Sequence, residues 1–130
     1  VLKNMMISTG SMRFITALAF LALAAASDAD ELLYIYSPDC GACMKWKAEV
    51  EPVYGKTQEA ITLPLTKITL EDWASGKHPL SNCQVAAVLG TPTFVQLHDC
   101  REVDRITGYS SDELFWFALA RMTNRAQALD

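Results

Sequence analysis

The sequence predicts an α/β domain with the element order β-α-β-α-β-β-α, in which a four-stranded mixed sheet is flanked by helices. In the first half of the chain, short runs of β-forming apolar residues alternate with helical runs. Further on, two strand-like runs are separated only by a short turn, and a helix-start signal follows them. We expect strands at residues 31–36, 64–70, 93–97 and 102–107, and helices at residues 41–60, 80–89 and 111–122.

The first strand and the first helix flank a turn that contains Pro38. Residues 32–36 form a short apolar run of the kind that becomes a buried strand. The helix that follows contains Pro52, which lacks an N–H and clashes with the preceding turn, so we expect a kink or break near residues 48–51. Trp46 on this helix is either a partner-docking aromatic or a core residue, and we favour the core.

The second helix is expected after a polar loop at residues 71–79. Ser81 or Asn82 can cap its start, and Gly90 can end it. Its buried face would carry apolar residues, namely Val85, Val88 and Leu89.

The chain closes with a hairpin and a helix. The spacing at residues 98–101 indicates a hairpin turn between the last two strands. Ser110 and Glu113 form a capping-box pattern that predicts the start of the last helix. We expect residues 124–130 to be a frayed tail.

The first 29 residues differ from the rest. Lys3 and Arg13 precede an uncharged apolar run at residues 14–26, whose small residues fit a cleavage site. We therefore expect residues 1–29 to be a secretory signal peptide, with an uncleaved anchor as the alternative, and residues 30–123 to be one domain. Export would place the domain in the periplasm, where disulfides are permitted. The net charge of −4 argues against nucleic acid as a partner, because no basic patch can neutralise phosphates.

The spacing of Cys40 and Cys43 indicates redox chemistry. Cys40 would lie at a helix N-terminus, where free N–H groups and the helix dipole favour a thiolate, the nucleophile of disulfide exchange. Cys43 would lie one turn later on the same face and could resolve a mixed disulfide on Cys40. The same spacing is also half of a zinc site.

A second motif, Thr91-Pro92-Thr93, precedes a strand-like run. Together with Cys40-Gly41-Ala42-Cys43 it resembles the thioredoxin superfamily, whose fold has the predicted element order and in which a cis-proline loop faces the two cysteines. The resemblance implies that Pro92 is cis and that Thr91 and Pro92 contact the substrate. Scattered residues further resemble the periplasmic thioredoxin-like proteins of bacterial sulfur-oxidation systems, the SoxS branch: Trp46, Glu49, Pro52-Val53-Tyr54, Thr57, Glu59, Pro64-Leu65, Phe94-Val95, Arg105, Gly108-Tyr109 and Phe115-Trp116.

Two positions depart from the superfamily pattern. Asp39 replaces a frequent Trp and sets negative charge beside Cys40, which opposes its thiolate. Tyr34 stands where many thioredoxins carry a buried Asp that moves the proton of the resolving thiol, so water, Glu49 or Lys45 would have to serve. We therefore expect a reducing protein with a potential well below about −120 mV, the strongly oxidising end of the range.

The other two cysteines, Cys83 and Cys100, would lie at the end of the domain remote from Cys40. We expect a structural disulfide between them, with two free thiols as the alternative. A zinc or copper site made of the four cysteines, with His78 and His98 in reserve, is the competing interpretation.

Three functions remain open. The first is an exported thiol-disulfide oxidoreductase that reduces a partner protein's cysteine, which the resemblance implies is that of a sulfur carrier, and that receives electrons from a membrane thiol-disulfide transporter. The second is a disulfide oxidase or isomerase of exported proteins. The third is a metallochaperone that uses the same cysteines. For the oxidoreductase we expect no cofactor, no bound metal and a monomer.

Overall fold

The computed structural model describes residues 30–130, and the expected signal peptide at residues 1–29 lies outside the described residues. The elements follow the predicted order, with the first helix divided into three and the second displaced. They are β1 (Asp30–Tyr36), α1 (Gly41–Glu49), α2 (Glu51–Tyr54), α3 (Gln58–Thr62), β2 (Leu65–Thr69), α4 (Leu70–Ser75), β3 (Thr93–His98), β4 (Arg101–Thr107) and α5 (Asp112–Leu129).

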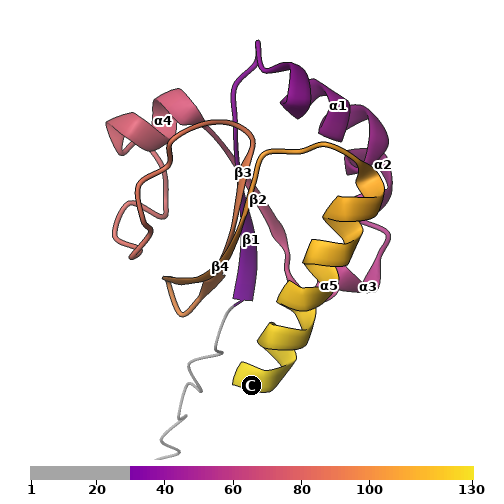
Figure 1. The fold of residues 1–130 in the computed structure, drawn as a ribbon. Coiled ribbons are helices and arrows are strands. Elements are labelled where there is room, and N and C mark those ends of the chain that lie inside the picture. Colours follow the sequence, from indigo (N-terminus) through magenta and orange to yellow (C-terminus); the bar gives the residue numbers. More distant parts are fainter. Residues whose placement is uncertain (1–29) are drawn as a thin grey trace, which may run out of the picture.

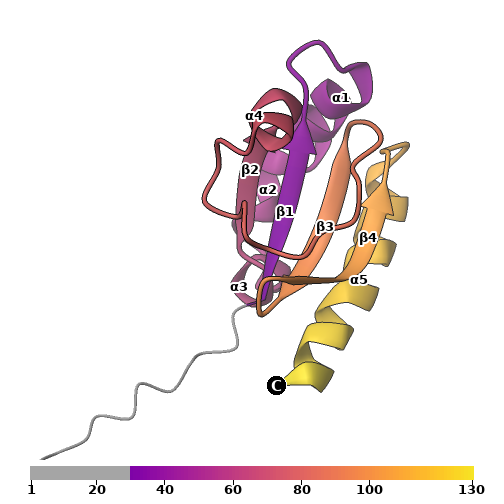
Figure 2. The ribbon, with the colours of Figure 1, turned by 90° about the vertical axis from the view of Figure 1, so that its left-hand side faces the viewer.

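The four strands form one mixed sheet in the order β2-β1-β3-β4, which confirms the predicted architecture. β1 pairs in parallel with β2 and antiparallel with β3, and β3 pairs antiparallel with β4. Figure 2 shows this order across the sheet. The two central strands, β1 and β3, are buried along most of their length because both of their faces are covered.

Helices cover both faces of the sheet. Figure 1 shows α1, α2, α3 and α5 on one side and α4 on the other. The larger core lies under α1 and α5, where Trp46 is fully buried between Tyr34 at 4.4 Å and Phe115 at 5.8 Å, measured between ring centroids. Trp46 is therefore a core residue, as expected.

The break in the first helix lies where Pro52 predicted it. α1 ends at Glu49, and Val50 separates it from α2, which has Pro52 in its first turn. The Val50 N–H still donates to the Trp46 carbonyl oxygen at 2.8 Å, and the Val50 carbonyl accepts from the Tyr54 N–H at 2.9 Å. The chain therefore changes direction without leaving these backbone groups unpaired.

The prediction of a helix at residues 80–89 is wrong. This segment has no regular helix, and its backbone bonds go to β4 instead: the Gln84 N–H donates to the Cys100 carbonyl at 2.8 Å, and the Glu102 N–H donates to the Gln84 carbonyl at 2.9 Å. Its apolar residues still pack on the sheet, as expected for Val85 and Val88, whereas Leu89 is 94% exposed.

The helix on this face is α4, in the stretch expected to be a loop. Thr69 caps its start by accepting from the Asp72 N–H at 3.1 Å. Gly76 ends it in the left-handed conformation at φ 70°, and its N–H bonds to carbonyls of the last turn. Both capping signals are local, so the sequence contained the evidence for this helix.

The last helix differs from the prediction at both ends. Ser111, rather than Ser110, is the N-cap, and its hydroxyl accepts from the Leu114 N–H at 3.3 Å. Residues 124–130 are not a frayed tail: α5 continues to Leu129, because Ala126 is fully buried in line with Met122. The predicted hairpin is present, with Asp99 and Cys100 in the left-handed region that suits a two-residue turn.

Candidate redox site

Cys40 lies where the turn after β1 becomes α1. The Cys40 N–H donates to the Ser37 carbonyl at 3.2 Å, which closes the turn around Pro38. Cys40 is the N-cap of α1: its backbone is extended, and its Sγ accepts from the Cys43 N–H at 3.1 Å. A sulfur in this position faces the free N–H groups of the helix, and these groups and the dipole favour negative charge on it.

Cys40 and Cys43 form a disulfide with Cα atoms 5.1 Å apart. The two cysteines differ in exposure, because Cys40 is partly exposed while Cys43 is 2% exposed beneath the first turn of the helix. An incoming sulfur can therefore reach Cys40 only, and Cys43 can act only within the protein.

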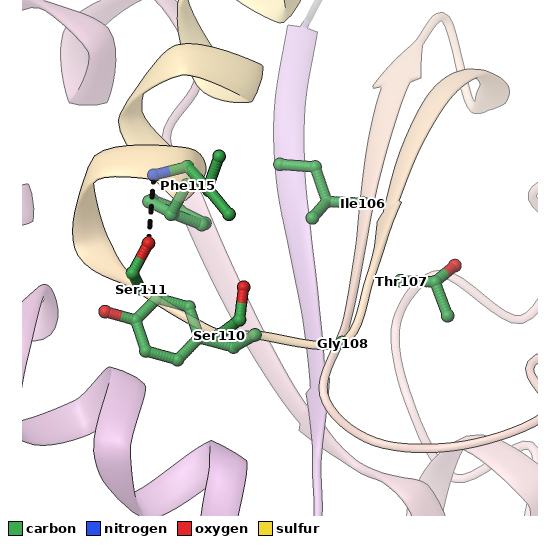
Figure 3. Close-up of a pocket in the computed structure, with 8 residues that line it drawn as sticks. Ile106, Thr107, Gly108, Ser110, Ser111 and Phe115 are labelled. Carbon is green, nitrogen blue, oxygen red and sulfur yellow. Dashed lines mark hydrogen bonds between the residues drawn. The ribbon is translucent and has the colours of Figure 1, made fainter.

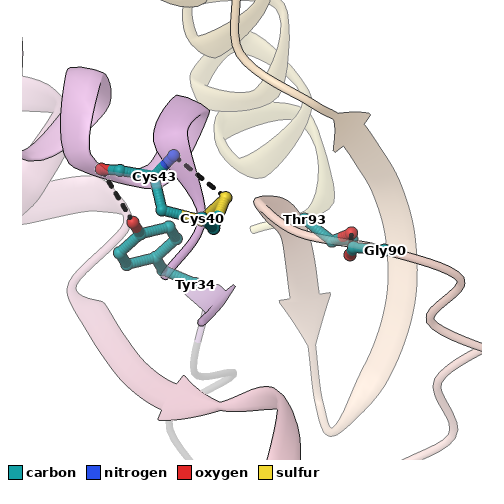
Figure 4. The surroundings of a disulfide bond; sticks show 5 residues. All are labelled: Tyr34, Cys40, Cys43, Gly90 and Thr93. Carbon is teal, nitrogen blue, oxygen red and sulfur yellow. Dashed lines mark hydrogen bonds between the residues drawn. A yellow bond between two sulfur atoms is a disulfide. The ribbon is translucent and has the colours of Figure 1, made fainter. Parts of the chain in front are cut away.

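The Thr91-Pro92 loop lies at the same end of the sheet. β3 runs antiparallel to β1 and begins with Thr93 opposite Ile35, so Pro92 lies level with the end of β1, from which the redox turn starts. The Thr91–Pro92 peptide bond is cis, Pro92 is buried and Thr91 is partly exposed. Figure 4 shows Gly90 and Thr93 across from Cys40.

A hollow of about 240 Å³ adjoins this loop, between β4 and the start of α5. It is lined by residues 106–111, Leu114 and Phe115, which Figure 3 draws as sticks. The Gly108 N–H donates to the Pro92 carbonyl at 2.8 Å, which joins the hollow to the proline loop. Lys45 on α1 donates to the carbonyl of Ser110, one of the lining residues, at 2.6 Å.

Tyr34 lies directly behind Cys43. Its hydroxyl donates to the Cys43 carbonyl at 3.5 Å, and its ring stacks on Phe94 with centroids 4.9 Å apart. Burial, with smaller contributions from Glu51 and Tyr36, raises the pKa of Tyr34 far above its usual value, so the phenol stays neutral. Tyr34 is thus a packing group and a hydrogen-bond donor and cannot act as a base.

Glu49 and Lys45, expected as possible proton carriers, are engaged elsewhere. Glu49 accepts from the Tyr109 hydroxyl, and Lys45 bonds to Ser110. Both side chains are well exposed on the α5 side of α1. Sequence reasoning did not single out Glu51, one of whose carboxylate oxygens pairs with Lys67 while the other is buried.

Cys83 and Cys100 form the second bridge in the structure, with Cα atoms 4.5 Å apart. Cys100 sits in the β3–β4 turn, at the far end of β3 from Pro92. The four cysteines are thus two separate pairs, and the structure does not bring them together as ligands of one metal. His98 pairs instead with Asp30 at 3.2 Å, and the ligand atoms of Asp30, His98 and Asp130 lie within 4.8 Å of one another.

No protein-family model matches the chain, and no curated protein matches its sequence. Among solved structures it is similar to the periplasmic thioredoxin SoxS from Paracoccus pantotrophus in its reduced form, with 32% identity, 75% of this chain and 99% of that chain covered, and a TM-score of 0.67. Two other thioredoxins share the fold. They are a mutant from Halobacterium salinarum NRC-1 (22% identity, 72% of this chain and 74% of that chain, TM-score 0.51) and the allergen from Malassezia sympodialis (17% identity, 74% and 76%, TM-score 0.51).

The sheet topology, the disulfide at the N-terminus of α1 and the proline loop beside it define a thiol-disulfide oxidoreductase with a thioredoxin fold. Within that class, the identity and near-complete coverage of SoxS show that the chain belongs to the thioredoxin superfamily as a SoxS-like member. Among residues 30–130, no helix is long and apolar enough to cross a membrane.

Proposed function

We propose that the protein is an exported reductant that acts on a disulfide or otherwise blocked cysteine of a partner protein. The observation that carries this proposal is the difference between the two sulfurs, with Cys40 accessible at a helix N-terminus and Cys43 enclosed behind it. Cys40 attacks the partner's disulfide, and Cys43 then displaces the partner as a thiol and forms the bridge. Two electrons and two protons pass from the cysteine pair to the partner.

Charge near Cys40 supports the reducing direction. Asp39 is exposed immediately before Cys40, and Gly41 and Ala42 contribute no cation that would stabilise a thiolate. A strong oxidant is strong because its reduced form is stabilised, and the negative charge of Asp39 acts against such stabilisation of the Cys40 thiolate. We therefore expect a potential below about −200 mV in equilibrium with glutathione or dithiothreitol, and a value above about −150 mV would support an oxidase instead.

The hollow between Gly108 and Phe115 is where we expect the partner's chain beside the reactive sulfur to rest, with Thr91 and Pro92 as the flanking contacts. The SoxS relative is periplasmic, and the features of residues 1–29 fit export to the same compartment. There the protein would act as a monomer, with a sulfur-carrier protein as its partner and a membrane thiol-disulfide transporter as its electron donor.

Trapping tests this proposal. Cys43→Ser in the native host should leave the partner covalently attached to Cys40, and the adduct should be released by dithiothreitol. Cys40→Ser is the matched control and should trap nothing. A set of newly exported proteins on Cys43→Ser, with no discrete partner, would favour the oxidase or isomerase. Stoichiometric zinc or copper in the reduced protein would favour the metallochaperone.

A further inference from the structure

The resolving step requires a group that can take the proton of Cys43. Only the thiolate attacks a mixed disulfide efficiently, yet Cys43 is 2% exposed, and burial disfavours its charged form. Neither Tyr34, which stays protonated, nor the outward-facing Glu49 can serve. The acceptor must lie where the surface comes closest to Cys43.

A pocket of about 300 Å³ reaches Cys43 from the β2 side of the sheet. Its titratable lining comes from all the elements packed around it: Tyr34 and Tyr36 from β1, Cys43 and Lys47 from α1, Glu51 from α2 and Lys67 from β2. At about 30 Å³ per molecule the pocket has room for several waters, enough to connect a side chain at one end with the sulfur at the other.

Glu51 is the proton acceptor in this lining. The ammonium groups of Lys47 and Lys67 have no lone pair to offer, and the hydroxyls of Tyr34 and Tyr36 are weak bases beside a carboxylate. Among the residues that line the pocket, Glu51 alone is a carboxylate. One of its oxygens, Oε1, pairs with Lys67, while Oε2 is buried and makes no hydrogen bond to any of residues 30–130. A buried carboxylate oxygen without a partner is rare and is set to accept a proton.

The ion pair holds this carboxylate in place. The Lys67 ammonium lies 5.5 Å above the ring of Tyr36, which stacks on Tyr34 with centroids 5.2 Å apart. Tyr34 in turn bonds to Cys43. The ion pair therefore fixes Glu51 in the pocket that also contains Cys43.

We propose that Glu51 accepts the Cys43 proton through the water of this pocket during resolution, and that it gives Cys43 a proton taken up from solvent when the bridge is reduced, an inference that rests on the proposed function. In resolution the proton passes to Glu51 and the Cys43 thiolate attacks Cys40 Sγ. The bond between Cys40 and the partner sulfur breaks, and the partner leaves as a thiolate that takes a proton from solvent. Glu51 then releases its proton to solvent, so atoms and charge balance.

Stopped-flow reaction of the reduced protein with dithiobis(nitrobenzoate) separates the two steps. Attack by Cys40 releases the first coloured thiolate, and attack by Cys43 releases the second. Glu51→Gln should leave the first phase within about twofold and slow the second about tenfold near pH 6.5, with the difference vanishing near pH 9, where hydroxide ionises Cys43. Glu49→Gln, which changes the carboxylate at the end of α1 that bonds to Tyr109 and does not line this pocket, should match the wild type in both phases.

A second measurement does not depend on turnover. In a Cys40→Ser background, the ultraviolet absorbance of the thiolate reports the ionisation of Cys43. Glu51→Gln should lower the pKa of Cys43 by roughly half a unit or more, because a facing anion is removed while the cations of Lys47 and Lys67 remain. An unchanged second phase, or an unchanged Cys43 pKa, would overturn the assignment of Glu51. A strongly oxidising potential would instead refute the proposed function and leave both of these readouts intact.

Discussion

Arg105 fastens the irregular segment before the proline loop to β4. Its guanidinium donates to the carbonyls of Ala87 at 2.9 Å and Ala86 at 3.0 Å, and to the Glu102 carboxylate at 2.7 and 2.9 Å. Glu102 also accepts from the Ala86 N–H at 2.8 Å. The segment at residues 80–90 has no helix of its own, so these hydrogen bonds and the Cys83–Cys100 bridge hold its backbone in place.

Arg105→Met keeps most of the aliphatic stem and removes every one of these bonds from the guanidinium. A hydrogen bond to a charged group contributes about 1.5–3 kcal/mol when it is buried, but the carbonyls of Ala86 and Ala87 can regain water because both residues are exposed. The Arg105 and Glu102 side chains themselves are only 22% and 18% exposed, so their pair is little screened. We expect a loss of about 2–3 kcal/mol of unfolding free energy at pH 7.

Arg121→Met is the matched control. Arg121 also makes a two-bond contact with a β4 carboxylate, that of Asp104, at 2.8 and 2.9 Å. Its side chain is 50% exposed, it holds no backbone carbonyl, and Asp104 keeps Arg125 as a second partner. The expected loss is below about 1 kcal/mol.

The sign of the pH dependence follows from Glu102. Burial would raise the pKa of Glu102, but the bonds from Arg105 and the Ala86 N–H outweigh it and hold that pKa below its usual value. A carboxylate with a depressed pKa contributes stability that is present above its unfolded pKa and is lost as the pH falls through its folded pKa. The gap between wild type and Arg105→Met should therefore be constant above about pH 5 and narrow toward pH 3. Guanidinium denaturation at about pH 5 and about pH 3 measures this difference in unfolding free energy. A loss of unfolding free energy no larger than that of Arg121→Met, or a difference that does not narrow in acid, would refute the reasoning.

Three further perturbations have definite expected outcomes. Replacing Cys83 and Cys100 together by Ala should cost about 3 kcal/mol, because the bridge spans 17 residues of sequence; equal denaturation midpoints with and without it would contradict this. Deleting residues 124–130 should cost about 2 kcal/mol, because buried Ala126 is lost and Met122 is uncovered; a melting temperature equal to that of the full chain would restore the frayed-tail interpretation. Trp46→Ala should lower the unfolding free energy by about 4 kcal/mol, because it leaves a cavity in the core. Trp46→Phe should lower it by only about 1 kcal/mol, because the buried indole N–H has no hydrogen-bond partner among residues 30–130 to lose. Calorimetry can check both values.

The strands and the break in the first helix were predictable because their signals are local. The run that became β1 is bounded by turn residues, and Pro52 cannot continue a helix in any context. The spacing of Val85 and Val88 is compatible with more than one conformation. The segment adopts its irregular conformation because it bonds to Cys100 and Arg105. These residues lie further along the chain, so the sequence of the segment alone does not predict the bonds.

In the redox site, too, the residues with local sequence signals were predictable and those placed by distant contacts were not. Cys40 and Cys43 could be identified from their spacing, because the chemistry needs one turn of helix between two sulfurs. Glu51 could not, because its position in the pocket that reaches Cys43 depends on the direction of the chain after Val50 and on its pairing with Lys67 of β2. In the sequence it was one more charged residue on a helix.

The hollow beside the proline loop and the pocket that reaches Cys43 have different roles in the proposed reaction. The hollow at Gly108 and Phe115 lies at β4, one edge of the sheet, and the pocket that contains Glu51 lies over β1 and β2, toward the other edge. In the proposed function, a partner protein would dock on Cys40 from the first side and leave the second open to water. Cys43 can then exchange its proton while the mixed disulfide is intact, which is the moment at which resolution needs it. An acid or base on the partner's side would be covered at that moment, so the β2 side is where a proton acceptor for Cys43 is of use.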